Sequence, residues 1–377
     1  MNSIKTFKNI SINLLLVFFG LFVSLVLIEI VLWILYPAPY IFTYSDPNIG
    51  AVFKPGDSGW YSAAPDGLRH KVIINSKGLR DKEYSYSKPD GTFRILILGD
   101  SMTAGLAVPR KKLFTEVLEQ RLNDNNNGNY EVINAGVPAR SVAEEFRFYR
   151  NEGYKYESDL VLLAFYIGND VRIPNSEASQ IKVVANRIVP KESQGFVGRI
   201  KAVLAHSHLY RFVGNIIPSV FPSFASLLRK EGLMTKPWLR DLFIFAKDYP
   251  EWVIESWDRT KDLILELKNT VELNESRLAI LFIPVIHQVD TAIWQENLEL
   301  NPDKKQVAWN LDKPNKYLGS WLKTQEIDYI DFLPIFRQEK KENNKRHYLR
   351  FDRHLNKYGH KVIGENLYNW IRMEFNL

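Results

Sequence analysis

The stretch RILILGDS at residues 94–101 is the part of the sequence that decides the fold. Its apolar run fits a β-strand buried on both faces, and the Gly-Asp-Ser that follows fits a tight turn into a helix. In a sheet of parallel strands, the carboxyl ends of the strands lie at one edge, and ligands bind there. The stretch therefore predicts an α/β protein with a candidate functional serine, Ser101, at that edge.

Four further apolar runs of the same kind follow, and helical patterns separate them. The predicted strands are 130–135, 159–166, 277–284 and 328–333, and the predicted helices are 111–123, 141–152, 255–273 and 357–375. Continuous apolar strands that alternate with helices are typical of a parallel sheet covered on both faces. For residues 93–377 we therefore expect a three-layer α/β/α sandwich around a five-stranded parallel sheet.

The N-terminal region carries an apolar run at residues 14–36 in which Glu29 is the only charged residue. Its length suffices to cross a bilayer as a helix. Lys5 and Lys8 precede the run, and no Lys or Arg follows it until Lys54. The positive-inside rule then predicts that residues 1–13 are cytoplasmic and that the rest of the chain is extracytoplasmic. A cleaved signal peptide would have a shorter apolar region and a small-residue cleavage site, and a buried soluble helix is seldom so apolar.

Two segments do not fit the strand and helix alternation. Residues 37–92 are rich in Pro, Gly, Ser and Asp, and we expect a connector with short strands. Residues 171–254 are far longer than a crossover requires, and their amphipathic and aromatic stretches predict a helical cap insertion. It is a lid or acceptor-binding surface beside the site, an interfacial patch that faces the membrane, or an ordinary packed insertion. His206 and His208 lie in this insertion, where we expect surface or packing roles.

The composition of the 377 residues excludes several classes of function. The chain has no Cys, so thiolate catalysis, Cys-ligated metal and disulfide bonds are excluded. The formal net charge is +6, but Lys and Arg are scattered, so we expect no nucleic-acid partner. Neither a phosphate-binding glycine motif nor an H-E-x-x-H motif is found, so we expect no cofactor and no metal.

Polar residues follow the other predicted strands in the way that Gly-Asp-Ser follows the first. These blocks are NAG (134–136), GND (168–170) and, before the last helix, DRH (352–354). Together the blocks supply every role of acyl chemistry at a serine.

Each role has a candidate. Ser101 is the nucleophile, His354 is the base that takes its proton, and Asp352 orients the imidazole. The backbone N–H groups of Ser101 and Gly136 and the side chain of Asn169 can donate to the oxyanion that develops.

This set of blocks resembles the SGNH/GDSL hydrolase family, with GDSMTAG (99–105), NAG, GND and DRH in the family's order. The resemblance implies a flavodoxin-like SGNH fold, esterase or acyltransferase activity, and roles for Ser101, Gly136, Asn169 and His354. The commoner family spacing is Asp-x-x-His, whereas this sequence has Asp-x-His. A spacing of two keeps both side chains on one side if that segment is extended.

Other polar residues compete for roles at the same edge. His287 follows the fourth strand and is either a substrate contact or the base, if the final block points away. Asp100, Asp170 and Arg140 are possible substrate contacts; Asp170 alternatively orients the neighbouring loop, and Arg140 alternatively forms a surface salt bridge. His360 lies in the last helix, where we expect a packing or capping role.

The sequence as a whole predicts a membrane-tethered serine esterase that acts on ester-linked acyl groups, such as acetyl, of an extracytoplasmic carbohydrate or lipid. An O-acyltransferase for envelope polysaccharide would use the same site. A catalytically inactive glycan-binding or scaffold protein is the alternative from another class. The oligomeric state does not follow from the sequence.

Overall fold

The computed structural model describes residues 2–35, 42–62, 69–124, 129–171, 181–184, 187–190, 204, 207–210, 212–213, 240–299, 301, 304–350 and 352–375. The chain divides into two compact units. One comprises Met1–Pro39, Val184–Arg187 and Glu192–Met234, and the other comprises Tyr40–Val183, Ile188–Lys191 and Thr235–Leu377.

The larger unit is built on a five-stranded parallel sheet. Its strands are β5 (Thr92–Gly99), β6 (Asn129–Gly136), β7 (Leu160–Tyr166), β10 (Arg277–Ile283) and β11 (Asp328–Asp331), and their spatial order is β11-β10-β7-β5-β6. Strand β5 pairs in parallel with both β6 and β7, and Gly99 lies opposite Gly136 and Ala164. The predicted five-stranded parallel sheet is confirmed.

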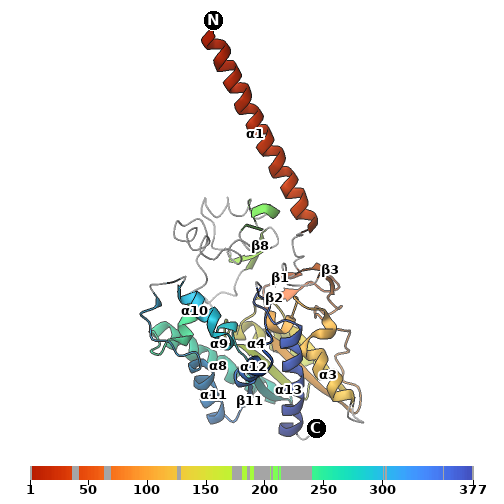
Figure 1. Cartoon of the computed structure of the whole chain (residues 1–377). Coiled ribbons are helices and arrows are strands. Elements are labelled where there is room, and N and C mark those ends of the chain that lie inside the picture. Colours follow the sequence, from red (N-terminus) through yellow and green to blue (C-terminus); the bar gives the residue numbers. More distant parts are fainter. Residues whose placement is uncertain are drawn as a thin grey trace. The chain divides into compact units, whose positions relative to one another are not determined.

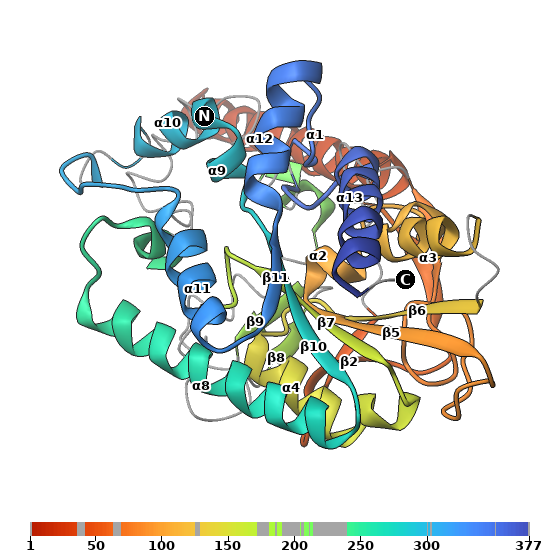
Figure 2. The ribbon, with the colours of Figure 1, turned by 90° about the horizontal axis from the view of Figure 1, so that it is seen from below.

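Helices cover both faces of the sheet (Figure 2). On one face lie α4 (Val142–Asn151), α8 (Glu251–Leu273) and α11 (Lys313–Thr324), and on the other lie α3 (Phe114–Asp124), α12 (Phe332–Asn343) and α13 (Lys357–Phe375). The short elements are α2 (Ser101–Ala104), α9 (Ile286–Val289), α10 (Thr291–Glu299) and the 3₁₀ turns η1 (Arg110–Lys112), η2 (Gly153–Tyr156) and η3 (Arg240–Phe245).

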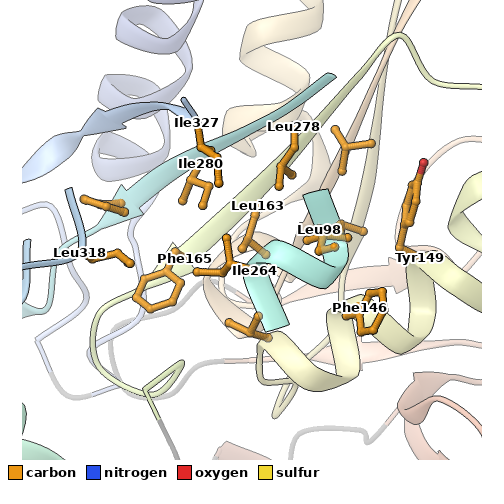
Figure 3. Close-up of a cluster of buried hydrophobic side chains, with 14 of the residues drawn as sticks. Leu98, Phe146, Tyr149, Leu163, Phe165, Ile264, Leu278, Ile280, Leu318 and Ile327 are labelled. Atoms are coloured by element: carbon orange, nitrogen blue, oxygen red, sulfur yellow. The ribbon is translucent and has the colours of Figure 1, made fainter. Parts of the chain in front are cut away.

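The alternation of side chains along each strand divides the apolar core into two layers. Leu96 and Leu98 of β5 belong to the layer under α4, α8 and α11, whereas Ile95 and Ile97 belong to the layer under α3, α12 and α13. Figure 3 shows the first layer, in which Leu163 of the central strand β7 packs among side chains from both strands and helices. Buried on both faces, these strands read as continuous apolar runs in the sequence.

The last strand and helix α12 correct the sequence analysis. The predicted strand 328–333 ends at Asp331, because the Asp331 side chain accepts a hydrogen bond from the backbone N–H of Leu333 at 2.9 Å and caps α12. The apolar Phe332 and Leu333 that prolonged the strand pattern are buried residues of the first helical turn.

The connector contains four short strands in the same compact unit as the sheet (Figure 1). They are β1 (Thr43–Asp46), β2 (Gly50–Phe53), β3 (Ser58–Tyr61) and β4 (His70–Ile73), and they pair antiparallel as β1-β2 and β3-β4. Their apolar residues form a small cluster with Ala104 and Val137, which follow β5 and β6. The Arg80 guanidinium donates to the backbone oxygens of Ala104 and Val108, each at 2.6 Å, so the connector holds the segment after Ser101.

The insertion differs in part from the expected helical cap. Strands β8 (Ile181–Val184) and β9 (Arg187–Pro190) form a two-stranded sheet that the sequence analysis missed, and α8 already begins at Glu251. Helical conformation is found at 204, 208–210 and 212–213. His206 and most of the insertion lie outside the described residues.

The smaller unit includes the long helix α1 (Asn2–Leu35). Its residues Ile12–Leu35 form an apolar stretch of 24 residues, long enough to cross a membrane. At 1.5 Å per residue it extends about 36 Å, against a hydrocarbon core of about 30 Å.

We predict that Leu163→Ala lowers the free energy of unfolding by about 2–5 kcal/mol, because it leaves a cavity in the centre of the sheet. The measurement is denaturant unfolding of the purified chain in detergent, followed by tryptophan fluorescence. Leu273→Ala is the matched control, since Leu273 is 84% exposed, and its effect should stay within about 0.5 kcal/mol. Equal effects of the two substitutions would contradict the assignment of Leu163 to the core.

Candidate active site

Ser101 is the first residue of α2, directly beyond the carboxyl end of strand β5. Asp100 caps this helix, and its side chain accepts a hydrogen bond from the backbone N–H of Met102 at 2.8 Å. A Cβ at Gly99 would lie 2.2 Å from Thr103 Oγ1, so only glycine lets the chain turn this tightly under the helix. The sequence Gly-Asp-Ser thus presents the partly exposed Ser101 at the edge of the sheet.

The structure brings Ser101, His354 and Asp352 together, although 253 residues separate the serine from the histidine. His354 Nε2 lies 2.9 Å from Ser101 Oγ, and His354 Nδ1 hydrogen-bonds to Asp352 Oδ1. An ionised carboxylate can only accept, so Nδ1 carries the proton and Nε2 accepts from the serine hydroxyl. This is the arrangement in which an imidazole removes the proton of an attacking serine.

The backbone of the Asp-x-His segment is not extended, which corrects the sequence analysis. Arg353, between the two residues, has a left-handed conformation with φ of +65°. Two backbone hydrogen bonds hold the loop closed: Leu349 N–H donates to His354 O at 2.8 Å, and Arg353 N–H donates to Leu349 O at 3.2 Å. A left-handed residue costs about 1–3 kcal/mol outside glycine, and here it lets Asp352 reach the ring of His354.

Electrostatics prepare His354 as a base. Burial by itself lowers its pKa, but the charge and the hydrogen bond of Asp352 raise it, and the net result is a pKa above the ordinary 6.5. Burial raises the pKa of Asp352, but the charge and the hydrogen bonds of His354 lower it by more. The net pKa of Asp352 is therefore below its ordinary value. Asp352 is therefore ionised at neutral pH and stabilises the imidazolium that forms when His354 accepts a proton.

Asn169 lies beside the serine turn, because β7 and β5 pair in parallel and their carboxyl ends meet. Its Nδ2 donates to Asp100 Oδ2 at 2.8 Å. A side-chain amide carries two N–H donors, so this bond fixes the amide while a second N–H is available in principle for a ligand. Asn169 is partly exposed, as a ligand contact requires.

Asp100 and Asp170 are not substrate contacts, contrary to one of the predictions from the sequence. Both are buried, Asp100 fully and Asp170 to 2% exposure. Asp170 Oδ2 accepts from the backbone N–H of Tyr166 at 2.7 Å and closes the turn that carries Asn169. Burial raises the pKa of Asp100 more than its hydrogen bonds lower it. The two carboxyl groups hold the loops of the candidate site in place.

Gly136 also has a different role from the predicted one. Its backbone N–H donates to Asn134 Oδ1 at 2.9 Å, so the donor assigned to an oxyanion is engaged within the strand end. A Cβ at position 136 would lie 2.4 Å from the backbone nitrogen of Ala104. Glycine is required here because α2 packs directly on β6, not because a substrate carbonyl approaches.

The turn after β6 contains a residue that the sequence analysis missed. Ala139 has a φ of +70° and is exposed. This turn starts beside the serine turn, since Val137 N–H donates to Gly99 O at 3.1 Å. Non-glycine residues in the left-handed region concentrate at functional sites. A sequence gives little warning of such a residue, because alanine does not usually mark a left-handed position.

His287 is not placed as the base, since His354 holds that position. It is 8% exposed and packs edge-on against Trp294, with ring centroids 6.0 Å apart. Burial, together with the charge of Arg353, lowers its pKa to about 4. His287 is therefore neutral at neutral pH. Its role as a substrate contact stays a prediction.

Arg140 was predicted to contact a substrate or to form a surface salt bridge. The structure instead buries it away from solvent. It is 2% exposed, and its guanidinium donates to Ala51 O at 2.8 Å and to Ala135 O at 3.0 Å. It thereby joins β2 of the connector to β6 of the main sheet. Its sequence position beside a candidate site loop gave no signal of this burial.

His360 has the packing role that we expected from the sequence. It is fully buried, stacks on Phe114 and accepts a hydrogen bond at Nδ1 from the Phe114 backbone N–H at 3.3 Å. Burial lowers its pKa to about 3.

Two supporting residues from the connector were also missed. Asp81 accepts a hydrogen bond from the backbone N–H of Asn134 at 2.8 Å, and burial raises its pKa to about 7. Tyr61 packs against the buried Ala107 and Leu349, and burial together with the charge of Asp352 raises the pKa of its hydroxyl. Side chains in a segment of low hydrophobic periodicity carry no sequence signal of this kind. Within the described part of the chain, no group of three or more His, Asp or Glu side chains is arranged to hold a metal ion.

Comparison with known proteins finds similarity in the fold alone. No family model matches the sequence, and no curated protein matches it. An acetyl xylan esterase is similar at 13% identity and a TM-score of 0.39, with 74% of this chain and 100% of that chain covered. A putative lipolytic protein of the G-D-S-L family from Desulfitobacterium hafniense has 12% identity, a TM-score of 0.38 and coverage of 73% and 98%. A lipase/acylhydrolase from Enterococcus faecalis has 12% identity and a TM-score of 0.40, with 75% of this chain and 96% of that chain covered. The geometry of this chain's own residues is therefore what supports a function.

We predict that labelling of Ser101 by a fluorophosphonate accelerates as the pH rises, with a midpoint above 6.5, because His354 must lose its proton before it can act as a base. Asp352→Asn should slow labelling and move the midpoint to lower pH, since burial then acts on His354 without the opposing carboxylate. Asp328→Asn is the control: Asp328 pairs with Arg277 at the amino end of β11, so its replacement should leave the midpoint unchanged. A midpoint that Asp352→Asn does not lower would contradict the coupling.

Proposed function

We propose that this protein is a serine esterase of the SGNH type that cleaves ester-linked acyl groups through an acyl-enzyme. The observation that carries the proposal is the continuous hydrogen-bonded series from Asp352 through His354 to Ser101 at the carboxyl edge of a parallel sheet. The order of the sequence blocks, with Asn169 held beside Ser101 by Asp100, also supports it.

The reaction begins when Ser101 Oγ attacks the ester carbonyl carbon and its proton passes to His354 Nε2. The carbonyl oxygen becomes an oxyanion, and hydrogen-bond donors fixed around it lower the barrier. The proposed donors are the Asn169 amide and the backbone N–H groups of Ser101 and Ala139. Proton transfer from His354 to the leaving alcohol breaks the ester bond and leaves the acyl group on Ser101.

Hydrolysis and acyl transfer differ only in what removes the acyl group. With water, His354 takes a proton from the attacking molecule, and a carboxylic acid leaves. With a sugar hydroxyl, the same step forms a new ester. We propose hydrolysis, with acetyl esters of an extracytoplasmic carbohydrate or lipid as substrates. An isotope-labelled acetyl donor, supplied with and without polysaccharide, would release acetate in both cases; label found on the polysaccharide would instead establish an O-acetyltransferase.

The location of the proposed substrate follows from the N-terminal helix. If α1 crosses the membrane with Lys5 and Lys8 inside, the esterase unit is extracytoplasmic. A reporter active only outside the cytoplasm, fused after Leu377, should then be active. Activity of a cytoplasmic reporter at the same position would overturn this orientation.

We predict that Ser101→Ala abolishes both fluorophosphonate labelling and hydrolysis of p-nitrophenyl acetate, because no other group replaces the nucleophile. Ser85→Ala, which removes the hydroxyl of an exposed serine in the connector, is the matched control and should retain both activities. Circular dichroism should show equal folding of the two variants. A wild-type chain that folds but neither labels nor hydrolyses would instead support an inactive binding or scaffold protein.

Asn169→Ala should lower kcat for ester hydrolysis by about 10²–10³-fold, as expected for loss of an oxyanion donor. KM should change much less, since the interaction strengthens only as the oxyanion forms. Asn151→Ala, on the exposed end of α4, is the control and should leave kcat unchanged. A change confined to KM would show that Asn169 binds the substrate in its ground state instead.

A further inference from the structure

Glu29 is the one charged residue in the apolar stretch Ile12–Leu35 of helix α1. It lies six residues before the end of the helix, which is about 9 Å along the axis at 1.5 Å per residue. A carboxylate at this position in a membrane helix is costly unless partners replace the water that it loses. Glu29 therefore requires hydrogen-bond partners within the fold.

A short segment of the insertion supplies these partners, and it belongs to the same compact unit as α1. Ser207 Oγ donates to Glu29 Oε2 at 2.9 Å, and the Leu209 backbone N–H donates to the same oxygen at 3.0 Å. The His208 backbone N–H donates to Glu29 Oε1, and the His208 ring nitrogen Nδ1 lies 3.1 Å from it. Both carboxylate oxygens are thus bound by two groups each.

The exposure of α1 supports the same contact along one side of the helix. Glu29 and Leu32 are partly covered, and residues three apart are neighbours on one helical face. The other large apolar side chains of Ile12–Leu35 that the structure describes are 37–74% exposed. The 207–210 segment therefore meets α1 on the face that carries Glu29.

We propose that Glu29 is a docking point that fastens residues 207–210 to the membrane helix, and that α1 is consequently retained in the mature protein. This inference rests on the proposed membrane anchor. A cleaved signal peptide would take the carboxylate away and leave the donors of Ser207, His208 and Leu209 without their acceptor. The docked segment then lies at the outer boundary of the membrane, in an insertion that follows the Asn169 turn in the sequence.

Cysteine crosslinking tests the contact cleanly, because the natural chain contains no cysteine. The full-length chain carrying Leu32→Cys and Leu209→Cys is treated in native membranes with a short bis-maleimide, and digestion with mass spectrometry detects the linked peptides. We expect a crosslink in this chain. The matched pair Val31→Cys with Leu209→Cys differs by one helical position, at a side chain that is 50% exposed, and should give none.

The carboxylate is tested by adding Glu29→Leu to the first pair, which should abolish the crosslink. Persistence of the crosslink in that chain, or equal crosslinking of the two pairs, would overturn the docking role of Glu29. An epitope tag placed before Met1 reports on retention: it should remain on the full-mass chain in the membrane, and its loss would overturn retention. Circular dichroism of each variant verifies folding, so these outcomes do not depend on the esterase proposal.

Discussion

Parallel hydrogen bonding of β5 on both of its edges is the constraint on which the candidate site depends. Because Gly99 pairs with Gly136 on one side and with Ala164 on the other, β5 and β6 end at the same level and β7 ends two residues further on. The turns that follow them are then adjacent whatever their sequences. Only with this register does the Asn169 amide reach the carboxylate that precedes Ser101. The final loop with His354 completes the site from a distant part of the chain.

Four buried polar residues near Ser101 hold loops in place: Asp100, Asn134, Asp81 and Arg140. Asp100 bonds the Asn169 amide, and the other three each bond a backbone group of a neighbouring segment. A buried polar group without a partner costs about 1–3 kcal/mol, so these side chains favour one arrangement of the turns over others. In the proposed esterase, this arrangement would hold Ser101, Asn169 and His354 in place before a substrate binds.

The sequence was sufficient to predict the sheet, because strands buried on both faces have an unmistakable apolar pattern. It also predicted the Ser101, His354 and Asp352 contact, since the ends of such strands meet at one edge. It failed where a role depends on backbone conformation or on burial. Gly136 was predicted to line the site, but a glycine is needed there because α2 packs against it. Arg140 was predicted at the surface, but it is buried and joins β2 to β6. No sequence pattern predicts the positive φ of Ala139. The small strands β8 and β9 lie in a segment whose composition suggested only helices.

The left-handed Arg353 has a consequence for how proteins of this type are recognised from sequence. With one residue in this conformation between them, Asp352 and His354 form a hydrogen bond at a spacing shorter than Asp-x-x-His. The number of residues between the aspartate and the histidine is therefore not a fixed property of such a site. Residues that tolerate a positive φ, such as Gly, Asn or Asp, could occupy the middle position equally well, whereas Val or Ile would oppose it. A search pattern that admits the shorter spacing, and forbids β-branched residues within it, would find chains that a rigid motif overlooks.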